Sequence, residues 1–177
     1  MRYFQLLADE RIIHRIQPPA WSLLRQQELL GAISAPGEEQ LPLTVHVQEE
    51  RNTIYPDLLD SPAPLVSGRV KSLLELFLPD TGWRAVMLTD IRRGSQHLYW
   101  LLQPPVIDAL SEQTIFRPDG TLKHLVLDHD KIDQPLFRIS GLREPYVYVN
   151  LAAAESLLRR SYTGIRLLRI PIEAQKQ

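Results

Sequence analysis

The chain has 177 residues, of which 44% are hydrophobic and 23% are charged, and its formal net charge is −1. These values are typical of a globular protein with one ordinary domain. A nearly neutral chain has no overall field that attracts nucleic acid or an anionic membrane, so neither partner is expected. The absence of cysteine excludes disulfides, thiolate metal ligands and cysteine nucleophiles.

The first residues, MRYFQLLADERIIHRI, lack the apolar core of a signal peptide, and no apolar stretch has the length of a spanning helix. A cytoplasmic location is therefore expected.

The first sixty residues predict short elements that we assign to the same domain as residues 61–177. Alternation and apolar spacing predict strands over 2–7, 11–16 and 43–48, and a helix over 21–31. The proline-rich stretch YPDLLDSPAPL, residues 55–65, is expected to be extended and is the best candidate for an internal boundary or a long surface loop.

A helix is predicted to follow this stretch, with Ser67 as its N-cap and Pro79 as its stop. Its apolar residues form one stripe, which should pack against strands that carry Trp83 and Tyr99. The stripe consists of Val70, Leu73, Leu74, Phe77 and Leu78.

Most of the remaining chain is predicted to form strands. A hairpin is predicted across the sequence RRGS, a second one across Pro118-Asp119-Gly120, and further strands in PLFRI, YVYV and IRLLRI. Asn150 is a candidate N-cap for a helix over 151–160. Because strands outnumber helices and follow one another, the predicted class is α+β, a mainly antiparallel sheet with two or three helices packed on it.

Both predicted junctions from helix to strand contain Thr-Gly, at Gly82 and Gly164. A glycine with positive φ is a common way to end a helix before a strand, so both glycines are candidates for that conformation.

One stretch, LVLDHDKIDQPLFRI, suggests a metal site or a general acid/base pair, because carboxylates and imidazoles alternate at the end of an apolar run. His124, Asp128 and Asp130 could in principle build a metal-dependent hydrolase. The spacing matches no established ligand pattern, however, and Asp commonly accepts hydrogen bonds from turn amides. The favoured interpretation is an exposed acidic turn formed by Asp128, Asp130 and Asp133, with no bound metal.

Other catalytic and binding templates do not fit. The glycines are too dispersed for a phosphate-binding loop, no nucleophile elbow is present, and the arginine pairs form no basic stripe with interleaved aromatics. Neither catalytic residues nor a cofactor are therefore expected.

Four segments in a fixed order carry a family resemblance: PLVSGRVKSLLE, HLYWLLQPPVIDALSEQTIF, LVLDHDKIDQPLFRISGL and VYVNLAAAESLLRRSYTGIRLLRI. Together they resemble the bacterial immunity protein eleven family of polymorphic toxin loci. The resemblance covers about two-thirds of the chain and rests on the order of the segments. It implies a small cytoplasmic protein that binds and neutralises a toxin encoded beside it, and it supplies no catalytic residues.

The expected function is therefore a non-enzymatic, immunity-like protein that binds a cognate toxin. The acidic turn is the candidate partner-binding surface, since exposed charge speeds association and many toxins that act on nucleic acid are basic. Two alternatives stay open: an adaptor or chaperone for a secreted effector, and the hydrolase built on His124, Asp128 and Asp130.

Overall fold

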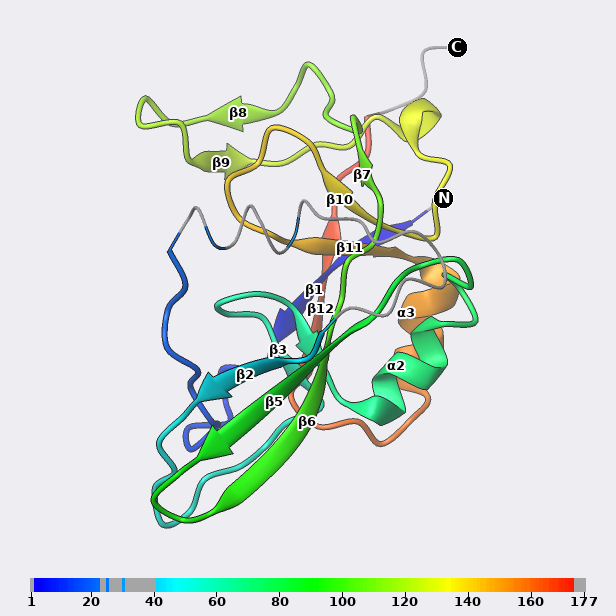
Figure 1. Cartoon of the computed structure of the whole chain (residues 1–177). Helices are drawn as coiled ribbons and strands as arrows, with labels where there is room; N and C mark the ends of the chain where they lie inside the picture. The colour runs from blue at the N-terminus through cyan, green and yellow to red at the C-terminus, as the bar shows by residue number, and fades with distance from the viewer. Residues whose placement is uncertain (1, 23–24, 26–29, 31–40, 174–177) are drawn as a thin grey trace.

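The computed structural model describes residues 2–22, 25, 30 and 41–173. Over these residues the chain forms two five-stranded sheets and a separate two-stranded sheet, and two α-helices have defined bounds (Figure 1). The α+β class is confirmed. The sheets are mixed, however, and not a single antiparallel one.

The first sheet joins the two ends of the chain. Its strands in spatial order are β12 (Ile165–Ile170), β1 (Tyr3–Ala8), β11 (Val147–Asn150), β10 (Leu136–Ile139) and β7 (Val106–Ile107). Strand β1 pairs antiparallel with both β11 and β12, so this N-terminal strand lies between two strands from the C-terminal part of the chain.

The second sheet contains the hairpin predicted across RRGS. Its strands in spatial order are β2 (Leu43–His46), β5 (Arg84–Asp90), β6 (Ser95–Leu101), β4 (Leu65–Val66) and β3 (Leu58–Leu59). Strands β5 and β6 pair antiparallel over their whole length, which confirms the hairpin.

Two strand pairs are parallel, β2 with β5 and β7 with β10, and they correct the expectation of antiparallel pairing. Parallel neighbours need a crossover connection, because a tight turn reverses the chain. Here the connections are long, since whole elements intervene between the paired strands in the sequence. Local turn signals therefore did not indicate this pairing.

Helix α2 (Gly68–Leu74) begins as predicted at Ser67, whose side chain accepts a hydrogen bond from the Val70 backbone N–H. It ends after Leu74, a turn earlier than the apolar stripe suggests. As a result Phe77 lies in the turn that follows the helix and is only partly buried.

Helix α3 (Leu151–Leu158) begins at Asn150, whose side-chain oxygen accepts a hydrogen bond from the Ala153 N–H at 2.9 Å. This confirms the second predicted cap. Gly164 has φ +77°, as predicted, while Gly82 is not among the positive-φ glycines of the described residues. The two Thr-Gly junctions therefore differ in backbone conformation.

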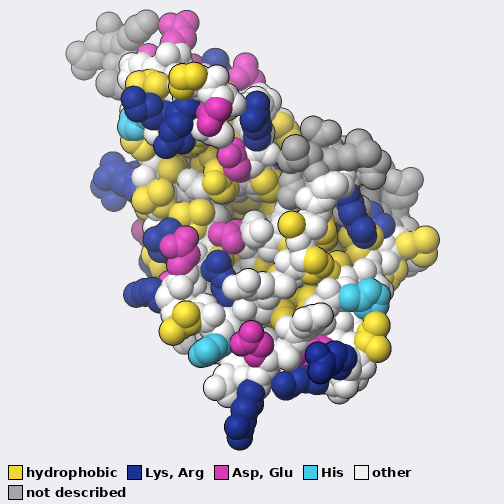
Figure 2. All heavy atoms as spheres, turned by 90° about the vertical axis from the view of Figure 1, so that its left-hand side faces the viewer, with side chains coloured by type: hydrophobic (Ala, Val, Ile, Leu, Met, Phe, Trp, Pro, Cys, Tyr) yellow, Lys and Arg dark blue, Asp and Glu magenta, His cyan; other side chains and the backbone are white. Residues whose placement is uncertain are grey.

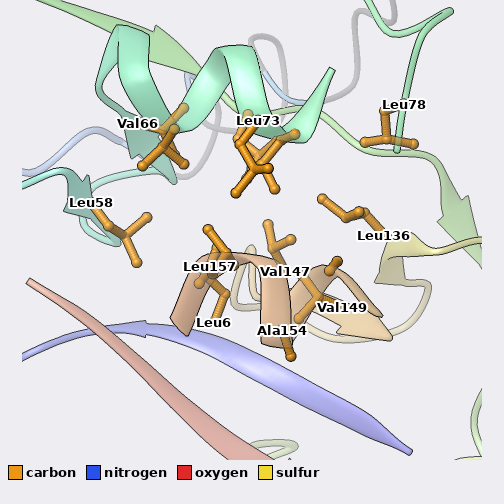
Figure 3. Close-up of a cluster of buried hydrophobic side chains, with 14 residues drawn as sticks. Leu6, Leu58, Val66, Leu73, Leu78, Leu136, Val147, Val149, Ala154 and Leu157 are labelled. Atoms are coloured by element: carbon orange, nitrogen blue, oxygen red, sulfur yellow. The ribbon is translucent and has the colours of Figure 1, made fainter. Parts of the chain in front are cut away.

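The two faces of the first sheet bury different cores, because side chains alternate along each strand. One core is shared with α2, α3 and β4, and Figure 3 shows its side chains converging between the two helices and the strands. It includes Leu6, Leu74, Leu136, Val149 and Leu157. The other core packs under residues 107–132 and includes Tyr3, Leu127, Phe137 and Tyr148.

A third core belongs to the second sheet and contains Val86, Leu88 and Leu101. Tyr99 lies in this core, where its hydroxyl donates to the Pro56 carbonyl at 2.6 Å. Helix α2 therefore contacts β6, the strand that carries Tyr99, as predicted, but it does not pack on the Tyr99 side chain. Strand alternation places Trp100 on the α2 side of β6 instead.

Residues 11–16 do not form the predicted strand. They contain turns and a single bridge, in which Arg15 pairs with Ile54. Apart from Trp21, Ser22, Arg25 and Leu30, the helix predicted over 21–31 lies outside the described residues.

Residues 55–65 are mostly buried, and they contribute both β3 and part of β4 to the second sheet. They are thus not a surface loop. The prolines suit this position because each strand is only two residues long.

The second predicted hairpin is present as the two-stranded sheet of β8 (Ile115–Phe116) and β9 (Leu122–His124). It extends from the upper part of the molecule in Figure 1. Gly120 has φ +80°, which suits the predicted turn.

Candidate functional site

The acidic turn lies in the segment that follows β9. Leu125, Val126 and Leu127 are buried, and the chain then forms a single 3₁₀ turn, η1 (His129–Lys131). Asp128 is its N-cap and accepts a hydrogen bond from the Asp130 N–H at 3.2 Å. The stretch therefore is a turn, as the capping chemistry of Asp predicts.

The three predicted partner-binding residues play different structural roles. Asp128 is partly buried, caps η1 and forms an ion pair with Lys131 at 3.7 Å. Asp130 and Asp133 are exposed, and no side-chain contact to their carboxylates is seen among the described residues. Only Asp130 and Asp133 thus present carboxylates that the turn itself does not use.

The turn is anchored to the sheet by His129. Its Nδ1 lies 3.4 Å from the hydroxyl of Tyr3 in β1, and the two rings are tilted at a centroid distance of 6.0 Å. Tyr3 is almost fully buried. The exposed carboxylates consequently sit on a base that is fixed to the first sheet.

Two segments distant in the sequence bring more acidic residues to the same place. The Asp128 N–H donates to the Ala109 carbonyl, and Leu127 pairs with both Leu110 and Ile172. The acidic residues on these flanking segments are Asp108, Glu112 and Glu173. The sequence alone did not indicate them, because only the tertiary pairing makes them neighbours of the turn.

Charge of both signs gathers at this end of the molecule, as the upper part of Figure 2 shows. The cations there include Arg117 and Lys123 of the β8–β9 hairpin, which are exposed. The surface is therefore patterned and not uniformly acidic.

The residues of the hydrolase alternative do not converge. His124 is an exposed residue of β9 opposite Ile115, whereas Asp128 is occupied as a cap. Within residues 2–22, 25, 30 and 41–173, no group of three His, Asp or Glu side chains is arranged to hold a metal ion. The geometry gives the hydrolase alternative no support.

A polar cluster that the sequence did not reveal surrounds Glu49. Its Oε1 accepts hydrogen bonds from the hydroxyls of Tyr55, at 2.6 Å, and Ser95. The Nε2 of His97 lies 3.6 Å from the same oxygen, and the His97 ring stacks on Tyr55 at 3.5 Å. The Ser95 hydrogen bond, and next the Tyr55 one, lower the pKa of Glu49.

This cluster has the residue types of a hydrolytic triad without its connectivity. In a triad the histidine lies between the nucleophile and the carboxylate, so that it can take the proton of the nucleophile. Here the Ser95 hydroxyl donates directly to Glu49. The carboxylate thus fixes the turn after β2 to the β5–β6 hairpin.

The tryptophans beside α2 also have an internal partner. The ammonium of Lys71 lies 4.7 Å from the Trp100 ring centroid and 5.5 Å from that of Trp83, and it forms an ion pair with Glu75. The aromatic pair is thus occupied by a lysine of the same chain.

In the part of the chain that the structure describes, no helix has the length and apolarity needed to cross a bilayer. No protein-family model matches the chain. No curated protein matches it either.

Proposed function

We propose that the protein is a non-enzymatic, immunity-like protein that neutralises a cognate toxin by binding to it. The observation that carries the proposal is the separation of roles in the acidic turn. Asp128 caps the turn, while Asp130 and Asp133 are exposed charges on a fixed base. Charges that the fold does not use are available to accelerate association with a basic partner.

The fixed base is relevant to affinity. Ordering a mobile surface on binding costs about 0.5–1.5 kcal/mol for each immobilised side chain, and a surface that is already held avoids part of this cost. The His129–Tyr3 contact and the buried residues before Asp128 hold the turn before any partner arrives.

The acids on the flanking segments extend the same surface. Asp108 and Glu112 are exposed and lie next to the segment that carries the turn, so a basic partner would meet several carboxylates together. The four collinear segments that resemble the immunity family add the expectation that this partner is a toxin.

The test is a double charge reversal, Asp130→Lys with Asp133→Lys, which leaves the Asp128 cap intact. The matched control is Glu10→Lys with Asp80→Lys, two exposed acids for which no side-chain contact is seen among the described residues. Binding to the toxin-domain product of the adjacent gene is followed by stopped flow at low salt. We expect the turn variant to associate at least about tenfold more slowly, and the control at nearly the normal rate.

Both variants should unfold within a few degrees of the wild type, because surface substitutions rarely change stability by more than about 0.5 kcal/mol. A turn variant that binds at the normal rate and still protects cells would show that the interface lies elsewhere. If the wild-type protein binds no product of its own locus, the immunity function itself is refuted. A secretion-apparatus operon around the gene would favour the adaptor alternative.

A further inference from the structure

A polar cavity of about 220 Å³ lies where β1 and β3 end, away from the acidic turn. Its lining includes the last residue of each strand, Ala8 and Leu59, together with Arg15, Asp60 and Ser61. A water molecule in the liquid takes up about 30 Å³, so the cavity has room for roughly seven waters or one small organic molecule.

Arg15 provides an unsatisfied cation in this cavity. Its Nη1 is buried and has no hydrogen-bond partner among the described residues. The position of Arg15 is fixed, because Ile54 donates to the carbonyl of His14 and accepts from the N–H of Ile16 on either side of it. A guanidinium is always charged and only donates, so a buried one without an acceptor is costly.

Asp60 provides the opposite charge in the same lining. Its Oδ2 accepts a hydrogen bond from the Ala8 N–H at 2.8 Å, which fixes the carboxylate at the end of β1. Both charged side chains therefore line the cavity without forming an ion pair with each other.

The cavity also has apolar lining residues. Ala8, Ile16 and Leu59 are buried, and the exposed Ser61 adds a hydroxyl to the lining. A ligand that fits must offer an acceptor to Arg15, a donor to Asp60 and a small apolar part to these three residues.

We propose that this cavity binds a small zwitterion of the α-amino acid class. The carboxylate of the ligand accepts from the Arg15 guanidinium, which matches a carboxylate in geometry as well as charge. The ammonium of the ligand donates to Asp60, and a short aliphatic side chain rests on Ala8, Ile16 and Leu59. An isolated anion would satisfy Arg15 but would face the charge of Asp60, which disfavours it.

The test measures the melting temperature and the heat of binding of the full chain with glycine, L-alanine, L-valine and L-glutamate. Acetate and methylammonium serve as the two halves of the ligand. At ten times its dissociation constant, a ligand that binds only the folded state should raise the melting temperature by roughly 3 to 6 °C. We expect at least one amino acid to produce this rise in melting temperature. Acetate and methylammonium should each bind at least about tenfold more weakly than that amino acid.

Two variants assign the contacts. Arg15→Met should abolish the effect of the amino acid. Asp60→Asn keeps an acceptor for the Ala8 N–H and should weaken amino acid binding while leaving acetate binding unchanged or stronger. Arg51→Met, at an exposed turn, is the control and should bind as the wild type does.

Binding of the amino acids is compared with binding of acetate and methylammonium on the wild-type protein alone. This comparison therefore remains valid even if a variant fails to fold. If no amino acid of the panel gives saturable stabilisation, the proposal is refuted. The same holds if acetate binds as tightly as L-alanine, or if Arg15→Met binds L-alanine normally.

Discussion

The carboxylate of Asp57 accepts a hydrogen bond from the Thr163 backbone N–H at 2.8 Å, although 106 residues separate the two in the sequence. The other carboxylate oxygen accepts from the hydroxyl of Ser67, the N-cap of α2, at 2.6 Å. One buried side chain thus links the start of α2 to the turn between α3 and β12.

Asp57→Ala should be among the most destabilising single changes in this protein. It leaves the Thr163 N–H and the Ser67 hydroxyl without their acceptor, and an unsatisfied buried group costs about 1–3 kcal/mol. We expect a loss of roughly 3 kcal/mol in the free energy of unfolding, measured by urea denaturation. Asp80→Ala, at an exposed turn, is the control. A loss under about 1 kcal/mol would show that Asp57 is dispensable.

Gly164 should tolerate no side chain. Its φ is +77°, and a Cβ atom at this position would overlap the ring of Pro56. Gly164→Val combines backbone strain with this overlap, so a loss of roughly 1–3 kcal/mol from strain alone is a minimum. Gly94→Val is the matched control, since Gly94 has φ +66° and open space around it. Thermal unfolding should rank Gly164→Val clearly below Gly94→Val, and equal melting temperatures would contradict the overlap.

The helix-side core should depend more on Leu74 than on Phe77. Leu74 is fully buried, and truncation of such a leucine to alanine costs about 2–5 kcal/mol. Phe77 is only partly buried, so Phe77→Ala should cost less than the roughly 3–5 kcal/mol typical of a fully buried phenylalanine. Leu76→Ala, at a residue that is 76% exposed, is the control. A larger loss for Phe77→Ala than for Leu74→Ala in urea denaturation would refute this ranking.

Features governed by neighbouring residues could be predicted from the sequence. The caps at Ser67 and Asn150 and the hairpin turn at Gly120 depend on a few adjacent residues. The strand hairpin of β5 and β6 belongs to the same group.

Features that join distant segments could not be predicted in this way. Residues 55–65 looked like a boundary because prolines usually mark loops, yet their burial depends on partners such as Thr163. The Arg15 cavity likewise forms only when β1 and β3 come together. The acidic turn was predicted as a turn, but the division of roles between Asp128 and Asp130 required its hydrogen bonds.

The Glu49 cluster predicts how stability depends on pH. Hydrogen bonds from Ser95 and then Tyr55 lower the pKa of Glu49 below its ordinary 4.5, and the N–H of Glu49 lowers the pKa of Asp90 below its ordinary 3.8. Both carboxylates therefore bind protons more readily in the unfolded chain. Their stabilising contribution is complete above about pH 4.5 and is lost as the pH falls through the folded-state values.

Glu49→Gln should reduce this acid sensitivity. The variant keeps an acceptor for the two hydroxyls but has no charge to titrate, so it should be less stable than the wild type at pH 7 and lose less stability below about pH 4.5. Urea denaturation across a pH series measures both effects. Glu50→Gln is the control, because Glu50 is exposed and next in the sequence. If Glu49→Gln and Glu50→Gln follow the same pH profile, the ionised Glu49 does not stabilise the contact between the turn after β2 and the β5–β6 hairpin.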